Sequence, residues 1–182
     1  MSAYRLSNSF PYLVNRVGVR IGEMFSRHLA PYDVTLPMYR VLASLWELQN
    51  QRLRDLGEMT SIELSTLSRL ISAMHRKGLV SRARVAGNER TVSINLTPKG
   101  RALAEVLIPQ AVHFEEVAIH SFGTDEVAKL KKALAIVYDH LNELEPQILA
   151  AEAPKARHSN RRSHRALRRK APPVTPMVAG RK

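Results

Sequence analysis

The side chains best suited to bind another molecule lie at helical spacing in the middle of the chain. They are Ser65, Thr66, Ser68, Arg69, Ser72 and Arg76. Short hydroxyls exchange hydrogen bonds with base edges or phosphates, and arginine binds phosphate or guanine with two parallel donors. No carboxylate follows Glu63 before Arg76, so nothing on this stretch repels an anion. These residue types predict a surface that reads double-stranded DNA.

A helix must present these side chains on one face. Its other face would carry a stripe of apolar residues at a spacing of three and four, namely Ile62, Leu64, Leu67, Leu70, Ile71 and Met74. Thr60-Ser61-Ile62-Glu63 has the form of a capping box and predicts the start of the helix. Gly78 predicts its end, as a left-handed C-cap.

A hairpin is predicted directly after this helix. Leu79 to Arg84 and Thr91 to Leu96 are rich in strand-forming residues, and Val85 to Arg90, with Gly87-Asn88 inside it, forms the turn. A short helix, a turn, a second helix and a basic hairpin make up a winged helix. A helix-turn-helix outline also occurs in proteins that never touch DNA. Four hairpin residues favour DNA, and we expect them to contact it: Arg82, Arg84, Asn88 and Arg90.

The positive charge of the chain is concentrated at one end. The 182 residues carry a formal charge of +12, and residues 154–182 hold ten Lys and Arg with no Asp or Glu. The remainder holds eighteen basic against sixteen acidic residues, so 18 − 16 = +2. We predict a basic, disordered tail over 151–182. It is either a solvated tail without function or a source of nonspecific attraction to nucleic acid, and the latter leads to the alternative function, an architectural DNA-binding protein.

Several function classes are excluded or disfavoured by composition. There is no cysteine, which excludes disulfides, thiolate metal sites and cysteine-based peroxide sensing. No signal peptide and no run of about 18 apolar residues is present, so we expect a cytoplasmic protein. No phosphate-binding glycine loop, HExxH motif or nucleophile elbow occurs, so we expect neither an enzyme nor a cofactor. His113, Glu116 and His120 share a helix face, but we predict an exposed polar face there and no metal.

Helices are also predicted on both sides of this region. Ser9 to Leu29 has apolar residues at helical spacing and ends before Pro31, and Thr35 with Pro37 predicts a second helix that buries Val41, Leu42, Leu45 and Leu48. Thr97-Pro98 predicts a long helix, kinked at Pro109, whose apolar stripe is Leu103, Val106, Leu107, Phe114 and Val117.

The last helix is predicted to begin at a Thr124 cap after Gly123. Its apolar residues alternate between spacings of three and four, and Pro146 ends that pattern: Val127, Leu130, Leu134, Val137, Leu141 and Leu144. So narrow a seam is typical of helices that pair between chains, and we predict dimerisation through the terminal helices. The alternative is ordinary packing within one chain.

From about Ser9 to Leu144 the order of elements resembles the MarR (multiple-antibiotic-resistance regulator) family. The residues that carry the resemblance are the segments LPMYRVL at 36–42, LSTLSRL at 64–70, KGLV at 77–80 and LTPKG at 96–100. The fold that it implies is mainly α with a small β-hairpin wing, a winged helix-turn-helix with N- and C-terminal dimerisation helices. We divide the chain accordingly into dimerisation helices at 1–34 and 98–150, a DNA-binding lobe at 35–97 and the basic tail at 151–182.

The resemblance further implies a homodimeric transcriptional regulator, usually a repressor, bound to a pseudo-palindromic operator. Such proteins leave DNA when a small ligand, often an aromatic acid, binds between the dimer helices and the DNA-binding lobe. The resemblance places Ser65, Thr66, Ser68, Arg69 and Ser72 on the recognition helix, and matches Arg90 to the wing arginine that enters the minor groove. For a ligand that is an aromatic carboxylate or its thioester, the candidate contacts are Arg16, Tyr39, Arg40 and His113.

The sequence departs from the family pattern at two positions. Asn88 stands where the family often has an aspartate, so the usual ion pair that supports the wing is absent unless Glu89 replaces it. Gly57 replaces a frequent alanine and lowers helix propensity. Both changes bear on the geometry of the lobe and leave the prediction of DNA binding in place.

Overall fold

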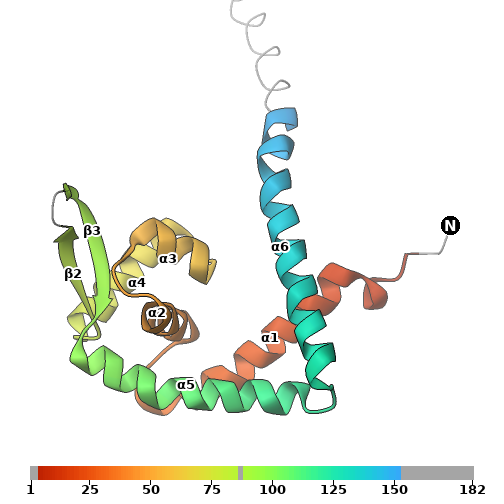
Figure 1. The fold of residues 1–182 in the computed structure, drawn as a ribbon, viewed down its shortest axis with the longest axis horizontal. Coiled ribbons are helices and arrows are strands. Elements are labelled where there is room, and N and C mark those ends of the chain that lie inside the picture. The colour runs from red at the N-terminus through yellow and green to blue at the C-terminus, as the bar shows by residue number, and fades with distance from the viewer. Residues whose placement is uncertain (1–3, 86–87, 153–182) are drawn as a thin grey trace, which may run out of the picture. The chain divides into compact units, whose positions relative to one another are not determined.

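A computed structural model describes residues 4–85 and 88–152. Within this part the side chains of Val85, of 88–91 and of five positions near the end of the last helix are not described. The chain divides into two compact units, Met1–Ser121 and Phe122–Lys182. The first unit contains the winged helix, and the described part of the second is a single long helix (Figure 1).

The first unit begins with a long helix and a corner. A short 3-10 turn, η1 (Leu6–Asn8), precedes α1 (Phe10–Leu29), in which Pro11 occupies the first turn, where its missing N–H is not needed. Pro31 ends the helix in a second 3-10 turn, η2 (Ala30–Tyr32). Asp33 follows in the left-handed conformation, with φ 54° and ψ 40°, and turns the chain into the next helix.

The second helix, α2 (Leu36–Glu47), is capped as predicted, because the Thr35 hydroxyl accepts a hydrogen bond of 3.4 Å from the Met38 N–H. Val41, Leu42 and Leu45 are fully buried. Leu48 was predicted to be buried as well, but it is 63% exposed because the helix has ended and the chain has turned extended there.

A two-residue strand, β1 (Gln51–Arg52), was not predicted. It is held by the buried Gln51 amide, which donates to the Ser44 carbonyl (2.7 Å) and the Leu48 carbonyl (2.8 Å) at the end of α2. The helix-turn-helix follows as α3 (Leu53–Thr60) and α4 (Leu64–Arg76). Of the apolar stripe predicted for α4, Leu67, Ile71 and Met74 are fully buried, while Leu64 is 46% exposed at the first position.

The wing is a three-stranded antiparallel sheet in the order β1-β3-β2, with β2 at Val80–Val85 and β3 at Asn88–Leu96. Val80 pairs with Leu96 and Arg82 with Ile94, and the register shifts between Arg84 and Val85. The predicted turn over Val85 to Arg90 is therefore too long: strand pairing already includes Val85 and Asn88. Residues 86–87, which include Gly87 of the predicted turn, lie outside the described residues.

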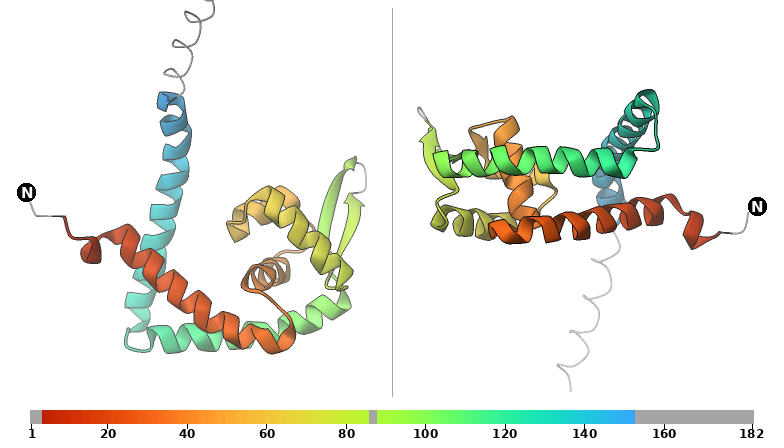
Figure 2. Two further views of the ribbon diagram at one scale, coloured as in Figure 1. Left: turned by 180° about the vertical axis from the view of Figure 1, so that it is seen from behind. Right: turned by 90° about the horizontal axis from the view of Figure 1, so that it is seen from below.

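The helix α5 (Pro98–Ile119) starts at the predicted cap, where the Thr97 hydroxyl accepts from the Gly100 N–H at 3.0 Å. It continues through Pro109 and runs beside α1 in the opposite direction (Figure 2), with the Phe25 and Phe114 rings 5.4 Å apart. Leu107 is buried, but Val106 and Val117 of the predicted stripe are 46% and 54% exposed. One core, built mainly from α2, α4 and α5 with Phe25 and Leu29 of α1, joins the elements of this unit.

In the second unit, α6 (Thr124–Glu152) has its N-cap one residue earlier than predicted. Gly123 rather than Thr124 is the cap, because its carbonyl accepts from the Val127 N–H and its N–H donates to Glu126 at 2.8 Å. The helix continues past Pro146 to Glu152, so the boundary predicted for the basic tail at 151 falls inside the helix. Four of the seam residues, Leu130, Leu134, Leu141 and Leu144, are 41–60% exposed.

Candidate nucleic-acid interface

The outward face of α4 is fixed by its buried stripe. Because Leu67, Ile71 and Met74 point into the core, the intervening positions face solvent. The candidates Ser65, Thr66, Ser68, Arg69 and Arg76 are all exposed, and Ser72 is partly buried. The structure therefore brings the six predicted helix residues to one continuous surface.

The N-terminus of α4 is capped by Glu63 and not by the predicted Thr60. Thr60 is the last residue of α3 and its hydroxyl donates to the Leu56 carbonyl, while Ser61 is left-handed with φ 53°. The Glu63 carboxylate accepts from the N–H groups of Ser65 (2.9 Å) and Thr66 (3.0 Å), and also from the Ser65 hydroxyl. These bonds satisfy donors that the first turn of a helix otherwise leaves open.

The same hydrogen bonds lower the pKa of Glu63 to about 2, the Ser65 hydroxyl contributing most. The carboxylate is therefore ionised throughout the physiological range and is fully exposed at the end of the helix. Because the Ser65 hydroxyl donates its proton to Glu63, Ser65 can contact a ligand mainly as a hydrogen-bond acceptor.

Arg82 connects the wing to the helix. Opposite residues of an antiparallel pair share a face, so Arg82, which pairs with the buried Ile94, lies on the face of β2 that is directed at the core. Its guanidinium donates to the Ser72 hydroxyl at 2.8 Å, and that hydroxyl donates to the Ser68 carbonyl at 2.9 Å. A cation of the wing is thus held against the exposed face of α4.

Arg84 follows Arg82 at a spacing of two and is exposed on the same face of β2. Asn88 begins β3 and Arg90 follows in the same strand, but their side chains lie outside the described residues, as does the basic tail from 153 onward. The predicted wing contacts at Asn88 and Arg90 therefore remain predictions.

The predicted ligand contacts separate into two places. Arg16 and His113 line one groove of about 720 Å³ between α1 and α5, whose other walls are mostly apolar: Leu13, Val17, Arg20, Ile21, Met24, Phe114, Val117 and Ala118. No residue of α2 lines it, although the resemblance implied a ligand site between the dimer helices and the DNA-binding lobe. Tyr39 and Arg40 instead line a shallower cleft with Ser44, Glu47 and Met59. Burial raises the pKa of Tyr39, whose ring packs edge-on against Phe25 at 4.8 Å.

Two kinds of site are not formed by the described residues. No group of three or more His, Asp or Glu side chains is placed to hold a metal ion there; His113 and Glu116 are 3.9 Å apart and both largely exposed. Among the helices of residues 4–85 and 88–152, none is long and apolar enough to cross a membrane.

The fold and this surface define a winged helix-turn-helix protein. The family model for the MarR family matches residues 34–92. The chain is 26% identical over 141 residues to the organic hydroperoxide resistance transcriptional regulator of Bacillus subtilis, covering 76% of this chain and 93% of that protein. It is 34% identical over 98 residues to the regulator TtmR of Methylorubrum extorquens, covering 54% of this chain and 50% of that protein.

Solved structures agree with these matches. MarR of E. coli in its apo form superposes with a TM-score of 0.59 at 26% identity, covering 71% of this chain and 96% of that one. BpsR of Bordetella bronchiseptica superposes with a TM-score of 0.69 at 23% identity, covering 76% and 99%. Together the fold and these matches support a MarR family winged-helix transcriptional regulator.

Three features of the site were not found from the sequence. Glu63 as a cap, the Arg82–Ser72 bond and β1 each depend on where neighbouring elements end. The only available signal for Glu63 was its place directly before the apolar Leu64, and the Thr60 pattern competed with it. Nothing in the sequence pattern indicated that Arg82 contacts Ser72 across ten residues of chain.

The Glu63 cap makes a prediction about pH. A carboxyl whose pKa is lower in the folded than in the unfolded chain stabilises the fold; this contribution is complete above the ordinary pKa of 4.5 and is lost as the pH falls toward about 2. We expect Glu63→Gln to lower the thermal midpoint at pH 7, with a difference from wild type that shrinks between pH 5 and pH 3. Thermal unfolding followed by circular dichroism across this range measures it. Glu58→Gln, which removes a carboxylate from an exposed ion pair within α3, is the control, and a difference independent of pH would contradict the role of the Glu63 charge.

Proposed function

We propose that this protein is a dimeric, ligand-responsive repressor that binds a near-palindromic operator through α4 and the wing and leaves it when a small aromatic acid or its thioester binds. The single observation that carries the proposal is the exposed face of α4, where hydroxyls and arginines stand together over a fully buried apolar stripe. Arg82, held at Ser72, adds a cation beside that face. Such a surface suits phosphate contacts and base contacts at once.

The proposal of a dimer is supported by apolar surface that each unit leaves exposed. In α1, Phe10 and Val14 do not line the groove between α1 and α5, and they are 52% and 43% exposed. In α6 the seam from Leu130 to Leu144 is exposed although its spacing is that of helices that pair. Burying such residues against a second copy removes apolar area from water, and a two-fold dimer would present two copies of α4 to one duplex.

The operator itself tests the proposal. We expect selection from a random duplex library, at near-physiological salt, to enrich a near-palindrome with half-site centres about 10 base pairs apart, one turn of DNA. Sedimentation of the complex should give two chains per duplex. Enrichment of no sequence would favour the alternative, an architectural protein that depends on its basic tail. In that case deleting residues 154–182 should abolish binding, whereas a specific repressor should keep its preference for the operator without them.

Individual arginines separate specific from general attraction. We expect Arg69→Ala to weaken operator binding by roughly 1–3 kcal/mol and to relax the preference at one base position, since an arginine on the exposed face of α4 is suited to a base edge. Arg90→Ala should weaken binding by a similar amount, through the loss of a minor-groove contact. Titration of labelled operator measures both effects, with sedimentation to show that the dimer persists. Wild-type affinity in both variants would show that the groove assignments are wrong.

The class of effector is proposed from the groove between α1 and α5. Its walls are mainly apolar, and the cationic Arg16 with His113 could hold a carboxylate there, while Tyr39 and Arg40 are candidates at the second cleft. The DNA binding of BpsR is regulated by 6-hydroxynicotinic acid, an aromatic acid. The B. subtilis relative is named for organic hydroperoxide resistance, but this chain has no cysteine with which to sense an oxidant through a thiol.

We expect at least one member of a panel of aromatic acids, including 6-hydroxynicotinic acid and salicylate, to release the operator. Arg16→Ala should weaken that release by about tenfold or more in effector concentration while operator affinity without effector stays unchanged, because the charge-assisted bond to the carboxylate is lost. Fluorescence anisotropy of labelled operator measures both quantities. Unchanged DNA affinity with every compound of the panel would contradict the aromatic-acid proposal without affecting the operator proposal.

A further inference from the structure

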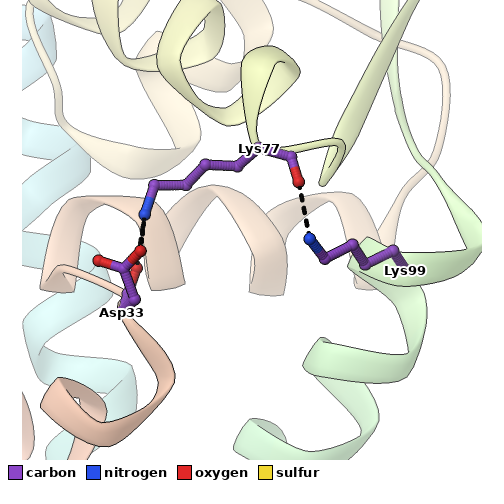
Figure 3. Close-up of polar contacts among 3 residues, drawn as sticks. All are labelled: Asp33, Lys77 and Lys99. Carbon is purple, nitrogen blue, oxygen red and sulfur yellow. Dashed lines mark hydrogen bonds and ion pairs between the residues drawn. The ribbon is translucent and has the colours of Figure 1, made fainter.

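The C-terminal end of α4 contacts two other parts of the first unit through one residue, Lys77 (Figure 3). Its side chain reaches Asp33, at the corner where α1 gives way to α2, and its carbonyl accepts from Lys99, in the first turn of α5. We propose that Lys77 is the joint that sets the orientation of the recognition helix relative to α1 and α5, with Asp33 as the positioning residue. This inference rests on the proposed DNA-binding role of α4.

The contact with Asp33 is made to both of its acceptors. The Lys77 ammonium donates to the Asp33 carboxylate and, at 3.1 Å, to the Asp33 backbone carbonyl. Asp33 has the left-handed backbone, which aspartate tolerates better than most residues. Its carboxylate and its backbone carbonyl both accept from the same Lys77 ammonium. The bond spans 44 positions of sequence and ties the end of α4 to the chain that leaves α1.

The contact with α5 holds the last carbonyls of α4. The Lys99 ammonium donates to the Lys77 carbonyl at 3.0 Å, and the Thr97 hydroxyl donates to the Gly78 carbonyl at 2.6 Å. Gly78, with φ 71°, ends the helix in the left-handed form. Gly100 comes so close that a Cβ there would lie 1.9 Å from the Leu79 carbonyl oxygen. These contacts fix the start of α5 against the end of α4. The bond between Lys77 and Asp33 attaches the same end of α4 to the corner after α1.

The Asp33–Lys77 pair contributes little to the stability of the fold. The Asp33 side chain is 90% exposed and that of Lys77 is 36% exposed, and ion pairs this accessible to water add little to folding free energy. Such a pair can still select one orientation of α4 among several of similar energy. Its loss should therefore alter DNA recognition and leave thermal stability unchanged.

A competing interpretation predicts the opposite sign. If Lys77 bound a DNA phosphate, Asp33 would compete with the phosphate, and removing the Asp33 charge would strengthen binding to all DNA. The general effect of removing a negative charge beside a DNA-binding surface is in the same direction. Weaker specific binding after neutralisation of Asp33 is therefore expected only if Asp33 positions Lys77.

The test uses Asp33→Asn in the full chain, since asparagine also tolerates the left-handed backbone. We expect affinity for the selected operator to fall by about 3- to 10-fold, with nonspecific affinity unchanged or slightly higher and with the salt dependence and the thermal midpoint unchanged. Lys77→Gln should show the same loss, and the double variant should be no weaker than the weaker single variant, because both remove one interaction. Glu58→Gln removes the same charge from the Arg54–Glu58 pair, which lies within α3 alone, and should not weaken binding.

Asp33→Gly guards against an effect of the asparagine itself, since glycine keeps the left-handed turn without the side chain. Equal losses in the two Asp33 variants support the proposal. Unchanged or stronger operator binding in either Asp33 variant overturns the proposal. A salt slope reduced by about one in Lys77→Gln also overturns it and identifies Lys77 as a phosphate contact. Failure of the wild type to select any operator would instead count against the proposed function, so the two failures are distinguishable.

Discussion

Burial of one side of α4 is the constraint on which the rest of the first unit depends. Leu67, Ile71 and Met74 are fully buried, and burying an aliphatic side chain of this size contributes about 1.5–3 kcal/mol. Rotating the helix to expose any of them would forfeit that energy. The helix can therefore present only the face that carries Thr66, Arg69 and Arg76. Packing on the buried side of α4 therefore determines which side chains its outer face presents to a ligand.

With its rotation fixed, α4 is also held at both ends by charged side chains. At its start the Glu63 carboxylate binds the open N–H groups, and at its end Lys99 binds the Lys77 carbonyl. A negative charge at the N-terminus and positive charges at the C-terminus both interact favourably with the helix dipole. Glu63 has a cost for DNA binding, because an ionised carboxylate stands at the end of the helix where an incoming phosphate would otherwise find open donors. In the proposed complex the contacts of α4 with DNA would then come from the middle of its face, where Arg69 lies.

The sequence was sufficient for features that depend on local spacing. Thr35 and Thr97 cap α2 and α5 as predicted, Gly78 takes the left-handed form, and the fold is the expected winged helix. The two caps and the Gly78 conformation follow from neighbours within four positions, and the fold followed from the order of the elements and the family resemblance. The errors arose where a longer-range contact decides the outcome. Thr60 resembled a cap, but its hydroxyl is used within α3, and β1 exists because Gln51 satisfies the last carbonyls of α2.

The same distinction applies to the candidate site. Which residues lie on the outer face of α4 followed from a period of 3.6, and the structure places them there. That Arg82 turns toward Ser72 follows from strand register, which depends on how β2 pairs with β3 and is not written in either strand alone. The ligand candidates were chosen by residue type, and type does not determine position: Arg16 and His113 share a groove, and Tyr39 and Arg40 line another.

The contacts of Lys77 offer a physical link between the proposed ligand response and the proposed DNA binding. The core joins α4 to α2 and α5 through apolar contacts, which resist separation but impose little direction. Hydrogen bonds are directional, and those of Lys77 connect α4 to the corner after α1 and to the first turn of α5. The groove lined by Arg16 and His113 lies between the same two helices, α1 and α5. A ligand that altered their separation would thus act on both attachments of the recognition helix, without touching the DNA-binding face itself.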